Sequence, residues 1–419
     1  MANTPKIRFR DCTDVWEQSE LGEISEIKTG PFGSALHAGD YVDEGIPIIT
    51  TEHFKSGSLQ IEKDGLPQVS EKDYKRLSEY TLVQGDIVFS RVGSVDINAL
   101  IMPVHSGWLF SGRVLRVRIN KELDCSFFHT FLETEQVKKD IRARAVGQTM
   151  PSINTEILKI TPIIFPASRA EQQQIGAFFR YLDHLINLHQ RKCDEAKELK
   201  KYMLQKMFPQ NGKKIPEIRF AGFTDDWEQR KLGEAGQTYT GLSGKTKEDF
   251  GHGQARFVTY MNVFSNPVSA PEMTEPIEID PRQNEVQVGD VFFTTSSETP
   301  EEVGMSSVLL EKQGTTYLNS FCFGFRPTEQ FDSYFLAYML RSEPIREQII
   351  LLAQGISRYN ISKNKVMEIT VSVPSLNEQR YVGKYFRNLD YLITLHQRKF
   401  DELKEVKKFM LQNMFPQKG

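Results

Sequence analysis

Residues 241–246 read GLSGKT, the stretch of this chain that most resembles a motif with a defined chemical task. A phosphate-binding loop has the pattern G-x-x-x-x-G-K-[ST], in which the first glycine starts the turn around the phosphates. The position five residues before Gly244 is Tyr239, so that glycine is missing. No clear strand precedes the segment either. We therefore expect no nucleotide site here.

Other patterns that carry catalysis are absent from the sequence. It contains no H-E-x-x-H, no nucleophile elbow, no G-x-G-x-x-G and no N-P-P-[FY] of the amino-methyltransferases. Two carboxylate pairs recur, Glu171 with Glu378 and Asp183 with Asp390. We interpret them as acids at helix starts, where the helix dipole favours negative charge. The sequence therefore predicts a chain with no catalytic residues.

Cysteine usage and composition limit the class of protein further. The four cysteines lie far apart with no C-x-x-C pair, which predicts neither a metal site nor a disulfide framework. The hydrophobic content of 39% is sufficient for folded cores. No signal peptide and no run of 18 apolar residues is found, so we expect a cytoplasmic protein without a membrane partner.

Basic and hydrogen-bonding residues in loops are the candidates for binding nucleic acid. Two Gly/Ser-rich loops, residues 29–37 and 240–250, follow the same L-G-E triplet. Glycine permits close backbone approach to DNA, and Ser, Thr, His and Lys can donate to phosphates and base edges. Ordinary connecting loops remain the alternative. The candidate DNA-binding residues are Lys28, Ser34, His37, Arg91, Arg113, Ser243, Lys245, Lys247, Arg256, Arg358 and Lys363.

The net charge of −3 does not decide the question, because a folded DNA-binding protein needs only a local basic face. Residues 111–144 contain eight basic and five acidic side chains, whereas residues 266–302 contain nine acidic and one basic. Phosphates would meet like charge along the second stretch. We expect residues 266–302 to form an acidic face turned away from DNA.

Two long helices are predicted from a repeat that spans the chain. Residues 178–210 recur as residues 385–417, with 24 of 33 positions identical. Both copies place residues of one row at alternating spacings of four and three, which is typical of a coiled-coil seam. His and Lys occupy some seam positions, either at the edge of the seam or as polar residues that fix register. Helices of roughly 40–50 Å, from about residue 180 to 208 and 387 to 415, should pair antiparallel.

A second apolar row lies partly off this seam, and two facing helices would not cover both rows. Another chain, or the protein's own globular parts, should contact it. We expect the subunit interface to include Leu182, Leu185, Ile186, Leu188, Leu199, Met203, Leu389, Leu392, Ile393, Leu395, Leu403 and Met410.

The repeat extends into the globular parts. Residues 5–23 match residues 216–234 at 12 of 19 positions, and the loop AVGQTMPSIN before the first helix resembles AQGISRYNIS before the second. Short β-branched runs, among them residues 114–119, 255–263 and 322–327, predict strands, and residues 125–144 have helical spacing. We expect an α+β fold, internally duplicated, in which two divergent inserts sit on a repeated frame with pseudo-two-fold symmetry.

These motifs together resemble the specificity subunit of type I restriction–modification systems over essentially the whole chain. The resemblance rests on the doubled W-E-Q-x-x-L-G-E, the SRVGS after G-D-I-V-F, the EQQQIG at residues 171–176, the F-x-x-L-D-x-L-I-x-L-H-Q-R-K helix and its M-F-P-Q end. The second copy departs with EQRYVG and lacks the arginine of SRVGS, so an equal role for Arg91 in both halves is not implied.

The resemblance implies two target recognition domains, each reading one half of a bipartite double-stranded DNA sequence, and helices that set the spacer. Implied partners are two modification subunits, which methylate adenine with S-adenosylmethionine, and two restriction subunits, which use ATP and magnesium; this chain itself would bind no cofactor and no metal. The implied domains are residues 1–165 and 213–372 for recognition, and 166–212 and 373–419 for the helical spacers.

Two alternatives to a DNA-reading subunit belong to other classes of protein. A non-catalytic scaffold could space two protein ligands without reading DNA, and it would show no salt-dependent DNA affinity. A fused single-chain restriction and methylation enzyme would need the nuclease and methyltransferase motifs that this sequence lacks.

Overall fold

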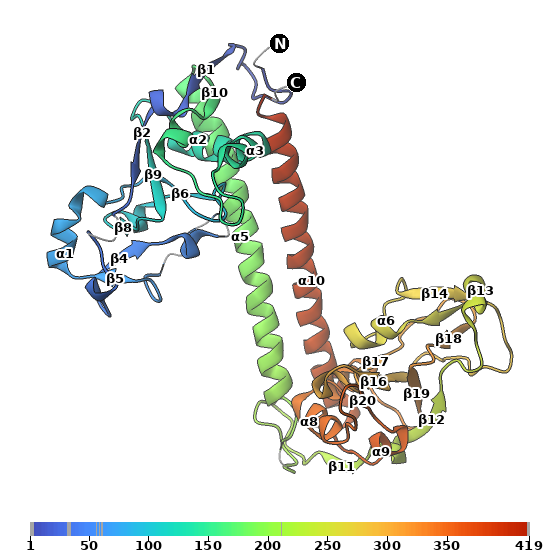
Figure 1. The fold of residues 1–419 in the computed structure, drawn as a ribbon. Coiled ribbons are helices and arrows are strands. Elements are labelled where there is room, and N and C mark those ends of the chain that lie inside the picture. The colour runs from blue at the N-terminus through green and yellow to red at the C-terminus, as the bar shows by residue number, and fades with distance from the viewer. Residues whose placement is uncertain are drawn as a thin grey trace. The chain divides into compact units, whose positions relative to one another are not determined.

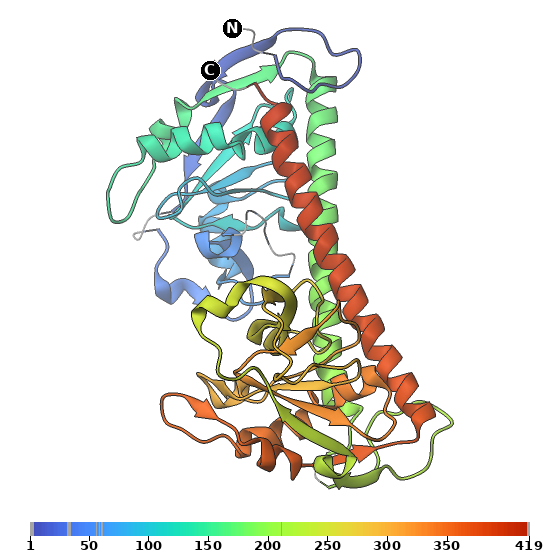
Figure 2. The same cartoon turned by 90° about the vertical axis from the view of Figure 1, so that its right-hand side faces the viewer.

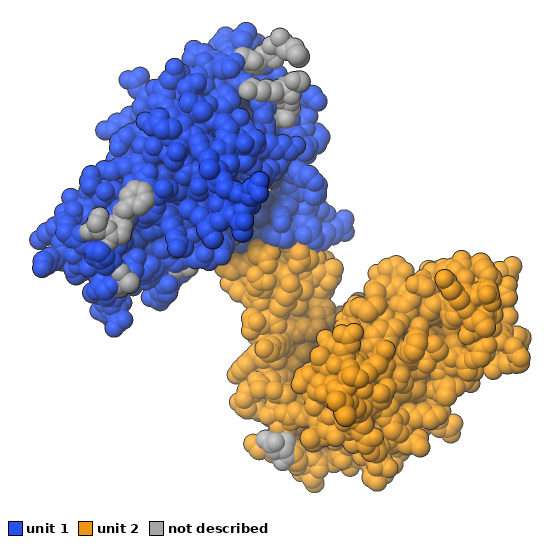
Figure 3. Space-filling view, viewed as in Figure 1, with its two compact units in different colours: residues 1–189, 398–419 blue, residues 190–397 orange. Residues whose placement is uncertain are grey.

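The structure is a computed structural model that describes residues 4–31, 35–55, 57, 59, 62–210 and 212–416. The chain forms two compact units (Figure 3). Unit 1 comprises residues 1–189 and 398–419, and unit 2 comprises residues 190–397. Each unit therefore contains one insert and part of each of two long helices.

Unit 1 is built on a four-stranded antiparallel sheet (Figure 1). Its strands, in spatial order, are β2 (Ser25–Thr29), β9 (Val114–Ile119), β6 (Ile87–Ser90) and β7 (Asn98–Leu100). The other strands are β1 (Trp16–Glu20) with β10 (Pro162–Pro166), and β3 (Tyr41–Val42), β5 (Gln68–Val69), β4 (Ile46–Ile49) and β8 (Leu109–Phe110). The short helices are α1 (Glu71–Arg76), α2 (Cys125–Leu132), α3 (Glu135–Arg144) and α4 (Thr155–Lys159).

Unit 2 repeats this plan with a different insert. Its four-stranded sheet has the order β12 (Gly236–Thr240), β19 (Cys322–Pro327), β15 (Val291–Thr294) and β17 (Ser306–Val308). The other strands are β11 (Glu228–Lys231) with β21 (Thr370–Val373), β14 (Thr274–Ile277), β13 (Phe250–Val258) and β18 (Thr316–Leu318), and β16 (Ser296–Ser297) with β20 (Tyr359–Asn360). The short helices are α6 (Tyr260–Ser265), α7 (Ser333–Met339), α8 (Glu343–Leu351) and α9 (Lys363–Met367).

The predicted mixed fold on a duplicated frame is thus confirmed, but three details differ. A strand does precede residues 241–246, since β12 ends at Thr240, and two predicted elements have other bounds. The strand expected over residues 255–263 ends at Val258, because Thr259 caps helix α6 and its hydroxyl accepts a hydrogen bond from the Asn262 amide at 3.2 Å. The single helix expected over residues 125–144 is divided between α2 and α3, which Thr134 separates with extended backbone.

The long helices begin earlier than the sequence predicted. α5 (Arg169–Lys206) and α10 (Leu376–Asn413) each contain 38 residues, or about 57 Å at 1.5 Å per residue. Each includes a glycine near its start, where α2 or α7 approaches closely. A Cβ on Gly176 would lie 2.8 Å from the Phe127 nitrogen, and one on Gly383 would lie 2.7 Å from the Phe335 nitrogen. Glycine is required at these helix contacts.

Parts of α5 and α10 lie side by side and antiparallel in each unit (Figures 1 and 2). In unit 1 the Lys407 ammonium contacts Asp183 at 2.7 Å across the seam and Glu133 at 2.8 Å. In unit 2 the Lys200 ammonium contacts Asp390 at 2.5 Å. Lys407 and Lys200 are equivalent in the repeat, as are Asp183 and Asp390. The two seam lysines therefore form specific ion pairs and do not merely reach past the seam to solvent.

The recurring carboxylates do more than favour a helix dipole. Asp183 and Asp390 lie inside their helices and not at the starts, so that interpretation is wrong for them. Glu171 does lie in the first turn of α5, but it is buried and accepts hydrogen bonds from Arg8 at 2.6 and 2.7 Å. Glu378 in the first turn of α10 binds Arg219 at 2.7 and 2.8 Å in the same way.

The segment that carries each of these arginines also contacts the end of a long helix. In unit 1 the Ile7 amide donates to the Asn413 carbonyl of α10 at 2.9 Å, and in unit 2 the Ile218 amide donates to the Lys206 carbonyl of α5 at 3.0 Å. These carbonyls have no hydrogen-bond partner within the helix, and the repeated segment supplies one. Each repeated segment thus joins the start of one long helix to the end of the other.

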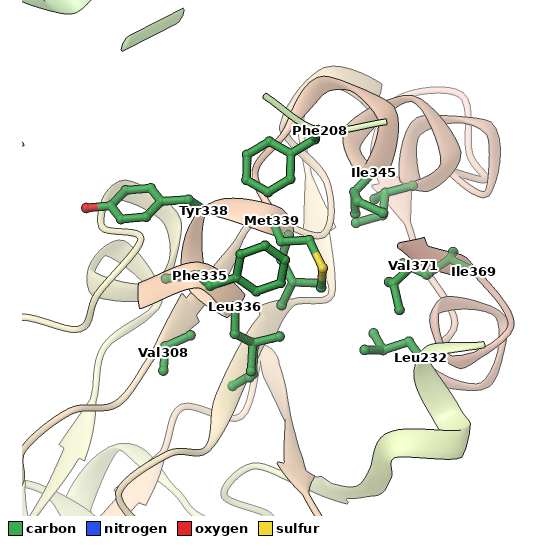
Figure 4. Close-up of a cluster of buried hydrophobic side chains, with 14 of the residues drawn as sticks. Phe208, Leu232, Val308, Phe335, Leu336, Tyr338, Met339, Ile345, Ile369 and Val371 are labelled. Carbon is green, nitrogen blue, oxygen red and sulfur yellow. The ribbon is translucent and has the colours of Figure 1, made fainter. Parts of the chain in front are cut away.

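The largest cores lie where short helices, sheet and long helices meet. In unit 2, Phe335, Leu336 and Met339 of α7 pack with Phe208 and Ile345 (Figure 4). In unit 1, Phe127 and Phe131 of α2 pack with Phe179 and Phe415, whose ring centroids are 5.8 Å apart. Burial of these aromatic side chains fixes each insert on the helix pair.

We predict that Lys407→Met lowers the free energy of unfolding of the full chain at pH 7 by about 2 kcal/mol, because Glu133 and Asp183 lose their counter-ion. Burial already raises the pKa of Asp183. Without the lysine, the folded state of the variant would bind more protons than its unfolded state, so lowering the pH stabilises it. The loss of free energy of unfolding relative to the wild type should therefore shrink as the pH falls toward about 5. Urea unfolding at both pH values measures this.

The control is Lys408→Met, which removes an exposed lysine from the same helix. Its free energy of unfolding should stay within about 0.5 kcal/mol of the wild type. Equal losses in the two variants would contradict a special role for the seam pair.

Candidate nucleic-acid interface

Three strand ends of the unit 1 sheet lie at one edge. β2 ends at Thr29 opposite Leu115, and β6 ends at Ser90 opposite Val114, where β9 begins. The loops that leave these ends, together with a hairpin before α4, form what we call the loop edge of unit 1: residues 29–31, 90–94, 111–113 and 146–152.

Backbone hydrogen bonds tie these loops together. The Arg91 amide donates to the Arg113 carbonyl at 2.9 Å, and the Ile153 amide donates to the Arg91 carbonyl at 2.9 Å. The first loop packs closely on the third, because a Cβ on Gly30 would lie 2.1 Å from the Ser111 carbonyl oxygen. The loop edge is therefore a hydrogen-bonded platform at the end of a sheet.

Unit 2 builds the same platform from other residues. The Thr295 amide donates to the Phe321 carbonyl at 2.9 Å, and the Ile361 amide donates to the Thr295 carbonyl at 2.9 Å. A Cβ on Gly241 would lie 2.1 Å from the Asn319 carbonyl oxygen. The loop edge of unit 2 comprises residues 240–242, 295–297, 319–321 and 354–360.

Neither loop edge contains a carboxylate, although the chain has 55 acidic residues. Arg113 and Arg358 are exposed on them, and Arg91 is half-buried. The nearest acids in sequence are Asp96, which pairs with Arg142 at 2.6 Å, and the exposed Glu298. In unit 2 the exposed Glu302 also borders the edge, because its carboxylate accepts a hydrogen bond from the Ser297 hydroxyl at 3.1 Å. Polar loops without negative charge can approach phosphates without like-charge repulsion.

The predicted DNA-binding residues of unit 1 fall into two groups. Arg91 and Arg113 lie on the loop edge; the Arg91 guanidinium donates to the Gly112 carbonyl at 3.2 Å, so it supports the neighbouring loop. Lys28 adjoins the edge, but its ammonium contacts Glu79 at 2.7 Å. His37 is exposed beyond the edge, and Ser34 lies outside the described residues.

The predicted residues of unit 2 are also divided. Arg358 lies on the loop edge, and Ser243 and Lys247 are exposed just beyond it. Arg256 lies on β13 and donates to the Thr274 carbonyl and hydroxyl, away from the edge. Lys363 begins α9 and is half-buried.

The loop 240–246 is held by part of the predicted acidic stretch. Asn284 donates to the Thr240 carbonyl at 3.1 Å, and the Lys245 ammonium contacts the buried Asp280 at 3.0 Å. Hydrogen bonds from Arg282 and Lys245 lower the pKa of Asp280 and keep it ionised. Residues 266–302 are therefore not one acidic face, because residues 280–284 form the support of a predicted DNA loop.

Sequence reasoning missed two exposed side chains. Phe321 is 56% exposed and has the place in unit 2 that Arg113 has in unit 1. Arg282 is exposed beside Lys245. Aligning SGRVLRV with NSFCFGF as repeat equivalents would have indicated Phe321, whereas Arg282 carries no repeat signal.

The predicted interface residues separate into a seam and an open face. Leu182 and Leu389 are buried, and Leu185, Ile186, Leu188, Met203, Ile393, Leu403 and Met410 are half-buried. By contrast, Leu199 and Leu392 are each 41% exposed, and Leu395 is 36% exposed. The second apolar row is thus uncovered in part, at Leu199, Leu392 and Leu395.

Among the residues that the structure describes, no cluster of three or more His, Cys, Asp or Glu side chains could hold a metal ion. Within the same residues, no helix is long and apolar enough to cross a membrane.

The comparisons with known proteins agree with this arrangement. A model of the type I restriction modification DNA specificity domain matches residues 13–198 and again 224–405. Over 97% of this chain the sequence is 24% identical to the MjaX specificity subunit of Methanocaldococcus jannaschii, covering 94% of that protein. The MjaVIII specificity subunit of the same organism is 22% identical, over 94% of this chain and 90% of that protein.

Solved structures show the same fold. The crystal structure of the type I restriction-modification S subunit from M. genitalium aligns with a TM-score of 0.63 and 15% identity, covering 99% of this chain and 100% of that chain. The chain belongs to the type I restriction modification DNA specificity domain family, which its two halves match separately. It is a type I specificity subunit, a class that recognises DNA and is not itself catalytic.

We predict that Arg113→Ala weakens specific DNA binding and lowers the slope of log affinity against log salt by about one. The reason is that Arg113 is exposed on the acid-free edge, where one phosphate contact would be lost. Fluorescence anisotropy at several salt concentrations measures the slope. Lys121→Ala is the control, since Lys121 is exposed beyond the opposite end of β9; an equal effect in both variants would argue against the loop edge.

Proposed function

We propose that each half of this chain reads one half-site of a bipartite double-stranded DNA target. The observation that carries the proposal is that one hydrogen-bonded platform recurs in both units with different side chains on it, Arg113 in one and Phe321 in the other. A common framework with different contacts is what reading two different half-sites requires.

The proposed division of the chain follows the repeat. Residues 1–165 and 213–372 would form the target recognition domains, and residues 166–212 and 373–419 the helical spacers. The spacer helices would set the number of base pairs between the half-sites, because their length is fixed at about 1.5 Å per residue.

In the assembled enzyme this chain would bind two modification subunits and two restriction subunits. Adenine methylation with S-adenosylmethionine, and DNA cleavage with ATP and magnesium, would take place on those partners. A solved structure described as concerning complex assembly of the type I system aligns with 96% of this chain at a TM-score of 0.50, which supports assembly as the setting in which this chain acts.

The test is a genome-wide map of 6-methyladenine in cells that express this chain with its cognate modification subunit, against cells without it. The expected result is a split motif, two short half-sites separated by a fixed spacer, with one methylated adenine on each strand. A continuous motif, or no new methylation from an assembled complex, would contradict paired reading. The alternative of a scaffold that does not read DNA would then be favoured.

The open face of the long helices is the proposed docking site for the modification subunits. Replacing Leu199, Leu392 and Leu395 together by Gln should weaken subunit binding at least tenfold, because each apolar side chain buried in an interface contributes on the order of 1 kcal/mol or more. Sedimentation velocity of the mixed subunits measures assembly.

The matched control is Val15→Gln, which changes an apolar residue that is 68% exposed outside the long helices. It should leave assembly unchanged. Residual methylation by the triple variant should keep the wild-type motif; a changed motif with intact assembly would place the docking site elsewhere.

A further inference from the structure

The hairpins of the two loop edges have a common construction. In unit 1, Val146 and Ser152 exchange backbone hydrogen bonds of 2.9 and 2.8 Å; in unit 2, Gln354 and Asn360 do so at 3.0 and 2.8 Å. Each hairpin then turns at a glycine with positive φ, +102° at Gly147 and +143° at Gly355. The same five-residue tip is therefore built twice.

Both tips expose one large apolar side chain. Met150 is 67% exposed, and Ile356 is 97% exposed. The polar and the apolar residue have exchanged places between the two tips. Met150 of unit 1 corresponds to Arg358 of unit 2, and Gln148 corresponds to Ile356. Single exposed apolar residues are common on protein surfaces. These two differ because each is the exposed apolar residue of the same five-residue tip, at different positions of it, in two inserts whose sequences have otherwise diverged.

The hairpins are held rigidly against the rest of the loop edge. The Gly93 amide donates to the Pro151 carbonyl at 2.8 Å in unit 1, and β20 pairs with β16 in unit 2. A Cβ on Gly355 would lie 2.0 Å from the Arg358 carbonyl oxygen, so the turn is closed tightly. A preorganised tip can insert an apolar side chain with little further loss of conformational entropy.

The charge around the two tips favours DNA over a protein as the molecule that binds them. Neither hairpin contains an acid, and they share their loop edges with Arg91 and Arg113 in unit 1 and with Arg358 in unit 2. Glu298 follows β16 and is exposed, so unit 2 has less positive charge near its tip than unit 1. Apolar side chains flanked by cationic groups are the type that enters between base pairs and unstacks them.

We propose that Met150 and Ile356 are apolar wedges that enter the base stack of the DNA duplex, one in each half-site. This inference rests on the proposed function and deepens it. A partner that modifies a base in a duplex must take that base out of the stack. An inserted side chain fills the space and holds the neighbouring base pairs apart, which would explain why both inserts keep the tip while their other contacts differ.

The test uses the complex of the full chain with its modification subunits and a duplex carrying the mapped split motif. The fluorescent base 2-aminopurine replaces the target adenine in one half-site at a time. We expect Met150→Ser to reduce the fluorescence gain on binding in one half-site only, and Ile356→Ser to reduce it in the other only. Specific affinity should fall about tenfold, while the salt slope stays unchanged because no phosphate contact is lost.

Control variants change exposed apolar residues at the opposite edges of the two sheets. Met102→Ser in unit 1 and Val288→Ser in unit 2, which are 45% and 60% exposed, should behave like the wild type. Wild-type fluorescence in both wedge variants would overturn the inference. Loss of subunit assembly in those variants, measured by sedimentation, would also overturn it and would assign the tips to a protein contact.

Failure of the proposed function has a different signature. A wild-type complex with no split methylation motif refutes paired reading and the wedges with it. The other outcome is that the wild-type complex reads the motif and unstacks the target base, and that the serine variants do the same. That result would refute the wedges alone.

Discussion

The ion pair between a seam lysine and an aspartate on the facing helix is the interaction on which the rest of each unit depends. Lys407 with Asp183, and Lys200 with Asp390, set the register of two antiparallel helices together with the repeated segments that join the start of one helix to the end of the other. Burial disfavours the charged form of Lys407, but Glu133 and Asp183 outweigh it and raise the pKa of that lysine. A helix pair in another register would leave these charges unpaired, at a cost of several kcal/mol.

The register of the helices matters because each insert contacts the helix pair through residues that bind the seam charges. Glu133 at the end of α2 binds the same lysine as Asp183, and the Tyr338 hydroxyl of α7 donates to Asp390 at 2.7 Å. The seam charges therefore position the short helices, the short helices pack on the sheets, and the sheets end in the loop edges. Sequence can vary widely at those edges without disturbing the chain of contacts behind them.

The sequence predicted the frame well and the site only in part. The repeat was visible because residues that pack on the long helices are constrained in both copies, and it identified the helices, the duplicated fold and the family. The role of Asp183 could not be predicted, because its partner Lys407 lies 224 positions away. The extra turns at the start of α5 were missed because Gly176 suggests a helix break unless the approach of α2 is known.

The loop edges were predicted only in part, for a related reason. Backbone hydrogen bonds assemble them, and these leave little trace in residue type; Arg91 and Thr295 occupy the same place although one is a cation and the other a hydroxyl. Basic residues alone were a poor guide, since Arg256 and Lys245 are engaged in internal contacts. The order of the strands in each sheet decides which loops lie at one edge, and residue types do not reveal that order.

The segments that join the start of one long helix to the end of the other have a genetic consequence. Ile7 and Arg8 make in unit 1 the contacts that Ile218 and Arg219 make in unit 2, and the two segments are identical at 12 of 19 positions. Recombination between such stretches would exchange a whole insert and leave every frame contact in place. A host cell could thus acquire a new DNA specificity by recombination, without a compensating mutation in the helices.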